Sequence, residues 1–401
     1  MHYAEQASAP PELPVMREGP LTAPPRDRYA ALREAGPIHR AGPGPGPAGW
    51  LVVGYDLARE ALAHPGLVPA PPGSPETPSR HSRLRDLVAG VMTPQRGQWL
   101  APRVRRIAVE LLDAMRGLRE VDLVLGYTAP LPVLSLCELL GVPQERRADY
   151  RRWSFQAFGV PSGSPEALAR LRDQLADLIA DKRRRPGDDL LSGLLAAEVS
   201  ETGEAGEAGE RVGEEELLDV ALSISAAGHL YLAGVLTDAV AALLRHPDQV
   251  ARLFRRPELL PGAVEEVLRY ALPAELAPVR FAAEDLVLGG VRVCRGEAVT
   301  IALSSAGRDA PVLGGKDPGI FDLTRVLARH LAFGHGAHAC PAASVVRLTL
   351  SIALITLFTR YPALSPAGPL DGCTGCGRPR LRVRLLRDRL PDEAPDERHA
   401  C

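Results

Sequence analysis

The sequence contains one helical pattern that is much longer than the others, over residues 214–245. It holds no proline, although the chain has 38 of them. At about 1.5 Å per residue, a helix of this length spans roughly 48 Å. Such a helix crosses an entire domain, so a chain of 401 residues must build its core around it. The pattern favours one large and mainly helical domain.

The apolar part of this stretch, 217–244, is also long enough to cross a membrane, which takes about 20 mostly uncharged residues. Three polar side chains interrupt it, Asp219, His229 and Asp238. Such side chains are costly inside a bilayer. The first residues show no basic segment followed by an apolar run, so no signal peptide is expected. We therefore expect a buried helix in a cytoplasmic protein, without a membrane partner.

Apolar residues that recur every three or four positions predict further helices. They fall at 26–36, 55–63, 261–271 and 341–360, and in a run over about 81–198 that is broken at Pro94, Pro143, Pro161 and Pro186. Period-two alternation between glycine turns predicts strands. These fall in a ribbon at 37–54, in a β region at 279–301 and at 381–386.

The connecting segments are richer in proline, glycine or charge. A proline-rich loop (64–79) is long for a compact domain, and such loops are often functional. An acidic, glycine-rich linker (201–216) is too polar to pack, and 307–330 is irregular. We therefore predict a mainly α fold with a small β region. Its parts are an irregular N-terminal segment (1–25), one large domain (26–388) and a polar C-terminal tail (389–401).

Composition argues against several classes of function. The formal net charge of −2 gives no reason to expect nucleic acid as a partner. Six cysteines in a chain this long do not suggest a disulfide scaffold. No GxGxxG pattern lies between a predicted strand and a predicted helix, so the chain lacks a flavin or nicotinamide fingerprint.

The strongest functional signal is the segment 331–358, LAFGHGAHACPAASVVRLTLSIALITLF. Gly334 and Gly336 let the backbone turn tightly and approach a flat ligand without a Cβ clash. Cys340 directly precedes the helix predicted from Pro341, so its sulfur faces unpaired N–H groups and the positive end of the helix dipole. Both favour the thiolate, which is the form of cysteine that binds metal.

Two other interpretations of this segment remain open on the residues alone. Cys340 fits a small buried cysteine on a glycine turn. His335, His338 and Cys340 also lie close enough together for zinc, although no fourth ligand at zinc-finger spacing is nearby.

The run FGHGAHAC closely resembles the heme-binding loop of the cytochromes P-450, Phe-Gly-x-Gly-x-His-x-Cys-x-Gly. Upstream, Glu266 and Arg269 in VEEVLRYALP match the Glu-x-x-Arg pair of that family, which locks the core beneath the heme. The likeness extends over nearly the whole chain and is to the soluble bacterial type. It implies a heme b whose iron is bound by Cys340.

The resemblance also assigns the positions around the cofactor. The loop residues Phe333, Gly334, His338 and Ala342 match heme-contacting positions. His81, Arg85, Arg280 and again His338 match residues that hold the heme propionates. The chemistry agrees, because a buried dianionic edge needs cationic or N–H donors. For His81 and Arg85, which are four apart on a predicted helix, a solvated helix face is the other interpretation.

Three positions depart from the family pattern. The glycine that usually lies two residues after the cysteine is Ala342, and the usual arginine before Phe321 is Ile320, which we expect to weaken the core lock. The largest departure lies in AGHLYLAG (227–234), where Leu230 and Tyr231 replace the usual acid and threonine. In the family that pair relays protons for cleavage of the O–O bond of dioxygen, and leucine carries no proton.

The resemblance implies a heme-thiolate oxidoreductase, either a monooxygenase or an oxidative-coupling enzyme, acting on a specialised metabolite. Its partners would be a small-molecule substrate and a separate ferredoxin and reductase that supply electrons. The substituted pair Leu230/Tyr231 keeps an alternative open. A non-catalytic homologue that activates another biosynthetic enzyme, such as a glycosyltransferase, also loses relay residues, but such homologues generally lack the heme cysteine.

Overall fold

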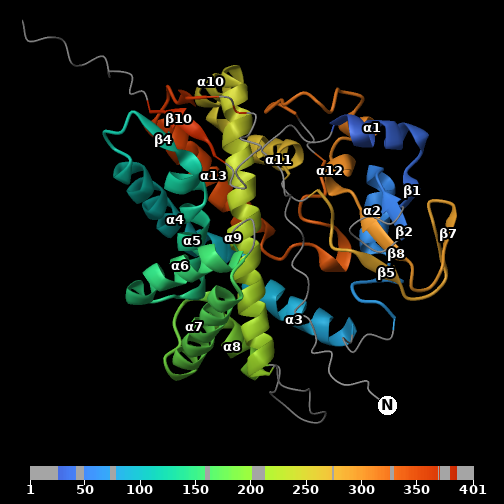
Figure 1. Ribbon diagram of the computed structural model, residues 1–401, viewed down its shortest axis with the longest axis horizontal. Coiled ribbons are helices and arrows are strands. Elements are labelled where there is room, and N and C mark those ends of the chain that lie inside the picture. Colours follow the sequence, from blue (N-terminus) through green and yellow to red (C-terminus); the bar gives the residue numbers. More distant parts are fainter. Residues whose placement is uncertain are drawn as a thin grey trace, which may run out of the picture.

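The structure is a computed structural model of the chain. It describes residues 26–41, 49–72, 78–158, 163–200, 213–272, 275–325, 329–368, 370 and 380–385. Helices make up most of it, and one of them, α9 (Glu214–Arg245), runs through the whole molecule (Figure 1). The helices α4 to α8 lie on one side of α9, and the largest sheet lies with α1 and α2 on the other (Figure 1).

The helices are numbered in the order in which they follow one another along the chain. They are α1 (Arg26–Ala35), α2 (Tyr55–Ala63), α3 (Pro78–Val91), α4 (Pro94–Ala114), α5 (Pro130–Leu140), α6 (Arg147–Phe158), α7 (Pro165–Arg184), α8 (Leu190–Ser200), α9, α10 (Pro247–Arg255), α11 (Leu260–Tyr270), α12 (Leu303–Ala306) and α13 (Ala343–Arg360). Short helical turns are η1 (Val124–Thr128, a π-helix), η2 (Gln144–Arg146), η3 (Pro257–Leu259), η4 (Ala310–Leu313) and η5 (Gly336–His338).

The strands form three small sheets. The largest has the order β1-β2-β8-β5-β3, with β1 (Ile38–Ala41), β2 (Gly49–Val52), β8 (Ala298–Ile301), β5 (Arg280–Ala282) and β3 (Leu67–Val68). The second has the order β4-β10-β9, with β4 (Glu120–Asp122), β10 (Arg382–Arg384) and β9 (Ser365–Pro366). The third pairs β6 (Leu286–Leu288) with β7 (Val291–Val293).

Prolines begin several of these helices, because the first turn needs no N–H donor from that residue. Pro94 starts α4, and the side chain of the preceding Thr93 accepts the N–H of Arg96 at 3.3 Å. Pro165 starts α7 in the same way, with Ser164 as the cap. Of the prolines expected to break the run of helices, Pro94 therefore starts a helix, whereas Pro186 follows the end of α7, and Pro161 lies outside the described residues.

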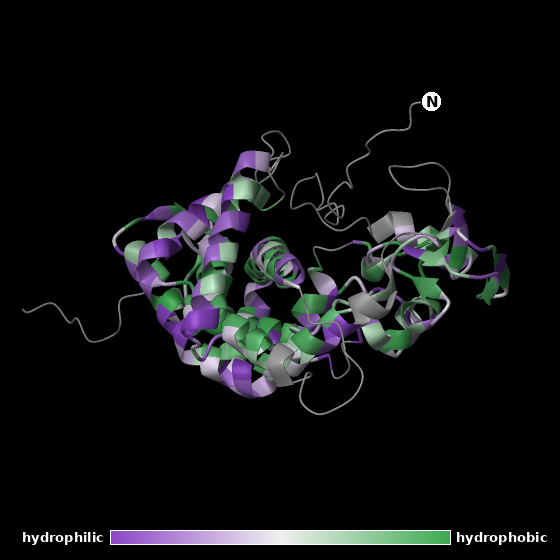
Figure 2. Cartoon of the chain, turned by 90° about the horizontal axis from the view of Figure 1, so that it is seen from below, coloured by the Kyte–Doolittle hydropathy of each residue, from purple (hydrophilic) through white to green (hydrophobic). Residues whose placement is uncertain are grey.

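The main core surrounds α9, which packs against α5, α6, α7, α10, α11 and α13. Seen along α9, apolar residues gather between the helices and polar residues lie on the outside (Figure 2). Two helices, α9 and α13, are long and apolar enough to cross a membrane by length and composition. Both lie in the interior of the helical half, and burial against other helices accounts for their apolar character.

Most predicted elements are present at their predicted places. The helix at 26–36, the ribbon at 37–54, the helix at 55–63, the long helix, the helix at 261–271, the β region and the last strand all appear, shifted by one or two residues at most. The mainly α fold with small sheets is confirmed. The predicted segments 1–25 and 389–401, and the end of the predicted domain at 388, lie outside the described residues.

Three predictions are wrong in detail. The helix expected from Pro341 begins at Ala343, because residues 341–342 form a turn. The predicted linker ends before Glu214, where α9 begins. The side chain of Glu216 is buried and accepts the N–H of Gly213 at 2.6 Å, so this residue packs although the linker was expected to be too polar to do so. The loop 64–79 contains β3 and the start of α3.

Two buried polar contacts fasten α6 to α9. The hydroxyl of Tyr150 donates to Ser225 at 2.7 Å, and one turn further on Ser154 is 2.7 Å from Nδ1 of His229. The rings of Phe155 and Phe158 meet the His229 ring edge-on, at centroid distances of 4.6 and 6.0 Å. Burial lowers the pKa of His229 from its ordinary 6.5 to about 4.

The lowered pKa of His229 makes stability depend on pH. Between pH 6.5 and 4 the unfolded chain binds a proton at His229 that the folded chain excludes. The stability gained from the neutral, buried ring is therefore complete above pH 6.5 and is lost as the pH falls toward 4. We expect this loss to be on the order of 3 kcal/mol.

The variant His229→Asn keeps a hydrogen-bonding partner for Ser154, but its side chain does not titrate. The difference in unfolding free energy between wild type and this variant, measured by urea titration, should shrink or change sign from pH 7.5 to 4.5; a pH-independent difference would contradict the assignment.

Candidate functional site

The cysteine loop lies between α2, α3 and α13. Its backbone is closed by a hydrogen bond from the N–H of Cys340 to the carbonyl of Phe333, at 2.7 Å. Gly334 and Gly336 have φ values of +70° and +71°, which residues with a side chain rarely adopt. A Cβ at Gly336 would also lie only 2.8 Å from Cα of Ala63. Glycine is therefore required at 336 both by conformation and by the close approach of α2.

Position 342 does not impose the same requirement. Ala342 caps α13 with φ −88° and ψ 8°, a conformation open to any residue, and it packs against the main core. The alanine that replaces the usual glycine therefore fits the backbone of this loop without strain.

The sulfur of Cys340 lies in a half-buried position. Burial raises the pKa of its thiol, while the N–H of Ala342 and the charges of Arg85 and Arg347 act in the opposite direction. The expected N–H and cation are thus present, but the free thiol is still favoured over the thiolate. A metal cation changes this balance, because a coordinating thiol is deprotonated outright.

Two guanidinium groups lie close to each other near this loop. Arg85 on α3 donates to the carbonyls of Ala337 (3.3 Å) and Ala339, and burial lowers its pKa. Arg280 on β5 is buried, and burial together with the charge of Arg85 lowers its pKa. Its Nε has no hydrogen-bond partner within the described part of the chain. The backbone of His81 lies on α3, but its side chain is outside the described residues.

The Glu266/Arg269 pair is completely buried, and all of its polar atoms are satisfied. Arg269 donates Nε and Nη2 to the two carboxylate oxygens of Glu266, at 2.7 and 2.8 Å. Its remaining N–H groups reach the carbonyls of Gly307, Pro318 and Ile320. The pair therefore fixes the irregular segment 307–325 against α11.

A second arginine, Arg325, to which the sequence assigned no role, reaches the same carboxylate. Nε of Arg325 lies 3.2 Å from Oε2 of Glu266, and its Nη2 donates to the carbonyls of Asp317 and Ile320. Ile320, where the family usually has arginine, points to solvent and is 57% exposed. The weakening of the Glu266/Arg269 contact that was expected from Ile320 is therefore offset, because Arg325 gives the carboxylate of Glu266 a second cationic partner.

Leu230 and Tyr231 lie near the middle of α9. Leu230 packs against the main core. Ala227 is exposed, and Tyr231 follows one turn later on the same face of the helix, half-buried. Burial raises the pKa of Tyr231 to about 12. This face therefore presents a phenol that holds its proton tightly and no carboxylate.

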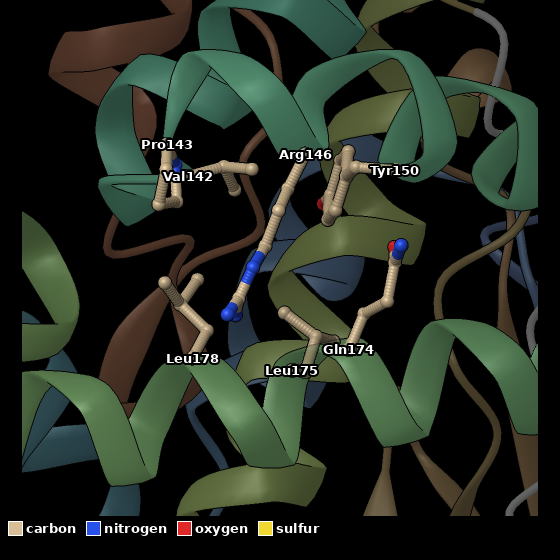
Figure 3. Close-up of a pocket in the computed structure, with 7 residues that line it drawn as sticks. All are labelled: Val142, Pro143, Arg146, Tyr150, Gln174, Leu175 and Leu178. Atoms are coloured by element: carbon tan, nitrogen blue, oxygen red, sulfur yellow. The ribbon is translucent and has the colours of Figure 1, made fainter.

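Other sites in the described residues are less suited to chemistry. A cavity between α6 and α7 has a volume of about 10 Å³, and Arg146 and Gln174 extend into it among apolar side chains (Figure 3). It is the size of one water molecule, too small for an organic substrate. In the described ranges no three His, Cys, Asp or Glu side chains are grouped so as to hold a metal ion, so the zinc alternative at His335, His338 and Cys340 gains no support.

Comparison with known proteins identifies the family. The family model for cytochrome P-450 matches residues 165–367. The chain is 39% identical over 377 residues to the cytochrome P-450 monooxygenase PikC of Streptomyces venezuelae, with 88% of each chain covered. It is 36% identical over 372 residues to the 6-deoxyerythronolide B hydroxylase of Saccharopolyspora erythraea, covering 84% of this chain and 88% of that protein.

A solved structure agrees with these relatives. The ligand-free form of CYP105P1 matches with a TM-score of 0.81 at 33% identity, covering 93% of this chain and 99% of that one. The chain therefore belongs to the cytochrome P-450 family and is a homologue of its bacterial monooxygenases. Membership implies a heme cofactor, which the Cys340 loop is suited to bind.

We predict that Arg325 contributes as a buried partner of Glu266. Arg325→Ala should lower the free energy of unfolding by on the order of 3 kcal/mol, since a buried carboxylate loses one of its cations. Arg256→Ala is the matched control, because Arg256 pairs with Glu258 at the surface, and it should change little. Urea unfolding of both variants checks this. Equal losses in the two would show that Arg325 does not support the pair.

Proposed function

We propose that this protein is a heme-thiolate monooxygenase that binds heme b through Cys340 and oxidises a specialised metabolite. The observation that carries the proposal is the Cys340 loop, which is closed by its own hydrogen bond and accepts hydrogen bonds from Arg85, with the buried cation Arg280 close to Arg85. Relatives named as PikC, as 6-deoxyerythronolide B hydroxylase and as mycinamicin IV hydroxylase/epoxidase support the class of substrate. The domain would extend over 26–388, in the cytoplasm.

The residues around the loop fit a heme. Arg280 is buried with an unpaired Nε, and its neighbour is another cation rather than a carboxylate. Two like charges in a partly buried site call for an anion, and the two propionates of heme b would supply it. We assign Arg85, Arg280, His81 and His338 to the propionates. Phe333, Gly334 and Ala342 would line the face of the cofactor on the cysteine side.

When bound, heme supplies reductive activation of dioxygen, with one oxygen atom going to the substrate and the other to water. The residues of this chain supply the surroundings. Cys340 provides the thiolate ligand, and Glu266 with Arg269 and Arg325 holds the segments beneath it. Tyr231 and Ala227, on one face of α9, would line the substrate pocket, with α6 and α7 packed behind that helix.

Electrons would come from a separate ferredoxin and its reductase, because the sequence has no flavin or nicotinamide fingerprint. One solved relative, cytochrome P450BioI, is described in complex with a fatty acid carried by an acyl carrier protein. Here we propose a free small molecule as the substrate, with neither nucleic acid nor membrane as a partner. An oxidative-coupling reaction remains within the same proposal, since it uses the same cofactor and ligand.

One observation favours a second candidate function. Leu230 and Tyr231 leave α9 without the usual proton relay, as expected for a non-catalytic homologue that activates another biosynthetic enzyme. The intact cysteine loop and propionate residues favour the enzyme. The absorption spectrum of the purified protein separates the two, because bound heme is expected for the enzyme and heme-free protein for the activating homologue.

Heme ligation by Cys340 is the first test. Reduced protein under carbon monoxide should show the red-shifted absorption band of thiolate-ligated heme, and Cys340→Ser should abolish it. The exposed Cys294→Ser is the matched control and should leave the band unchanged. Purification of heme-free protein from cells supplied with heme precursor would contradict the proposal.

The propionate assignment predicts a loss of cofactor retention. Arg85→Ala/Arg280→Ala removes both cations and leaves buried carboxylates poorly paired, which commonly costs about 2–5 kcal/mol. The double variant should lose heme on gel filtration, as measured by the ratio of heme to protein absorbance. Arg292→Ala, at an exposed position of strand β7, should retain it. Full retention by the double variant would remove these residues from the site.

The missing relay predicts poor coupling of electron use to product. Delivery of a proton by a positioned acid is typically worth about 10²–10⁴ in rate. Leu230 has no proton to donate, and Tyr231, whose pKa is raised to about 12, is a weak proton donor. With a substrate analogue that lacks a hydroxyl near the site of oxidation, most electrons should therefore appear as hydrogen peroxide or water. The measurement is product formed per reductant consumed.

Variants at the same two positions separate the explanations. Leu230→Glu/Tyr231→Thr should raise coupling with the analogue. Tyr231→Phe should leave the coupling of wild type unchanged, because we assign Tyr231 to the pocket lining. A collapse in coupling in Tyr231→Phe would instead make the phenol the working donor. Tight coupling of wild type with the hydroxyl-free analogue would show that another relay exists.

A further inference from the structure

Glu265, the neighbour of Glu266 on α11, holds two side chains beside the cysteine loop. Its carboxylate receives Nε and Nη2 of Arg347 on α13 at 2.6 and 2.8 Å, which is a two-pronged contact. Nε2 of His330 lies 3.1 Å from the same carboxylate. Because Nδ1 of His330 accepts the N–H of Ala332 at 3.2 Å, Nε2 carries the hydrogen donated to Glu265. Sequence reasoning singled out neither Glu265 nor its two partners.

Both partners of Glu265 contact the same ring. The guanidinium of Arg347 lies over Phe333, 4.6 Å from its centroid. The ring of His330 meets Phe333 edge-on at 6.2 Å. Since the carbonyl of Phe333 accepts the N–H of Cys340, the orientation of this ring is coupled to the closure of the loop. Glu265 thus fixes the loop without touching Cys340.

Charge gives this arrangement a second consequence. The positive charge of Arg347 is close enough to Cys340 to favour a negative sulfur, as is that of Arg85. Glu265 binds the same guanidinium and offsets its field at the sulfur. The side chains of Glu265 and Arg347 are 31% and 40% exposed, so solvent screens part of the effect but not all of it.

We propose that Glu265 is a positioning residue that lowers the reduction potential of the heme, by fixing Arg347 over Phe333 and balancing its charge. The inference rests on the proposed heme ligation by Cys340. Reduction of the iron adds one electron beside the sulfur, and a nearby positive charge favours it. Removing the charge of Glu265 leaves Arg347 unbalanced and raises the potential. Removing the charge of Arg347 leaves Glu265 unbalanced and lowers it.

The test is a double-mutant cycle on the heme-loaded protein, with the ferric/ferrous midpoint potential as the readout. Glu265→Gln should shift the potential in the positive direction and Arg347→Gln in the negative direction. The double variant should return close to wild type, and Glu265→Asp, which keeps the charge, should stay close to it. Glu258→Gln is the matched control, because Glu258 also pairs with an arginine but lies at the surface, and it should cause no shift.

The outcomes distinguish this inference from the proposed function. A thiolate-type spectrum in every variant together with shifts of opposite sign supports both. Unchanged potentials in Glu265→Gln and Arg347→Gln, with only a loss of thermal stability, would overturn the inference and leave heme ligation standing. Shifts of the same sign in both single variants would also overturn it, because they would report loosening of the loop rather than charge. A wild-type protein without heme would overturn both.

Discussion

The buried ion pair of Glu266 and Arg269 is the interaction on which the region around the cysteine loop depends. Taking two charges out of water costs several kcal/mol per ion, and only complete hydrogen bonding offsets this. Here every N–H of the Arg269 guanidinium has an acceptor, and three of these are backbone carbonyls of Gly307, Pro318 and Ile320. A segment whose regular structure is limited to the short turn η4 thereby acquires a single path, because any other path would leave a buried charge unsatisfied.

Two adjacent carboxylates on α11 bind different segments of the chain. Neighbouring residues on a helix point about 100° apart. Glu266 therefore binds the segment 307–325, while Glu265 binds α13 and the residues that precede the cysteine loop. One short helix thus holds both the chain that leads to the loop and the helix that leaves it. In the proposed site, the position of the sulfur thus depends also on contacts made by residues that are distant from it in the sequence.

The sequence predicted the local features well and the non-local ones poorly. Helix bounds followed from apolar spacing, as at 55–63, and the tight turns of the cysteine loop followed from Gly334 and Gly336. The pairing of β2 with β8 joins Gly49 to Ala298, and no local pattern encodes a partner 249 positions away. The substitution at Ile320 suggested a weakened lock, but Arg325 reaches the same carboxylate because the chain folds back between them. The roles of Glu265 and Arg347 depend in the same way on contacts between distant segments.

The substitutions on α9 change the chemistry that this helix can supply more than they change its packing. Leu230 adds apolar surface to the core, where a carboxylate would be poorly solvated. Poor solvation raises the pKa of a carboxylic acid toward neutrality, which suits a proton donor at physiological pH. Burial moves Tyr231 in the unfavourable direction, because a phenol already holds its proton too tightly and its pKa rises further, to about 12. Partial burial on α9 would thus improve a carboxylic acid as a proton donor, but it makes a tyrosine a poorer one. In the proposed enzyme, protons must therefore come from the substrate or from water that the substrate orders, and catalysis becomes selective for substrates able to do so.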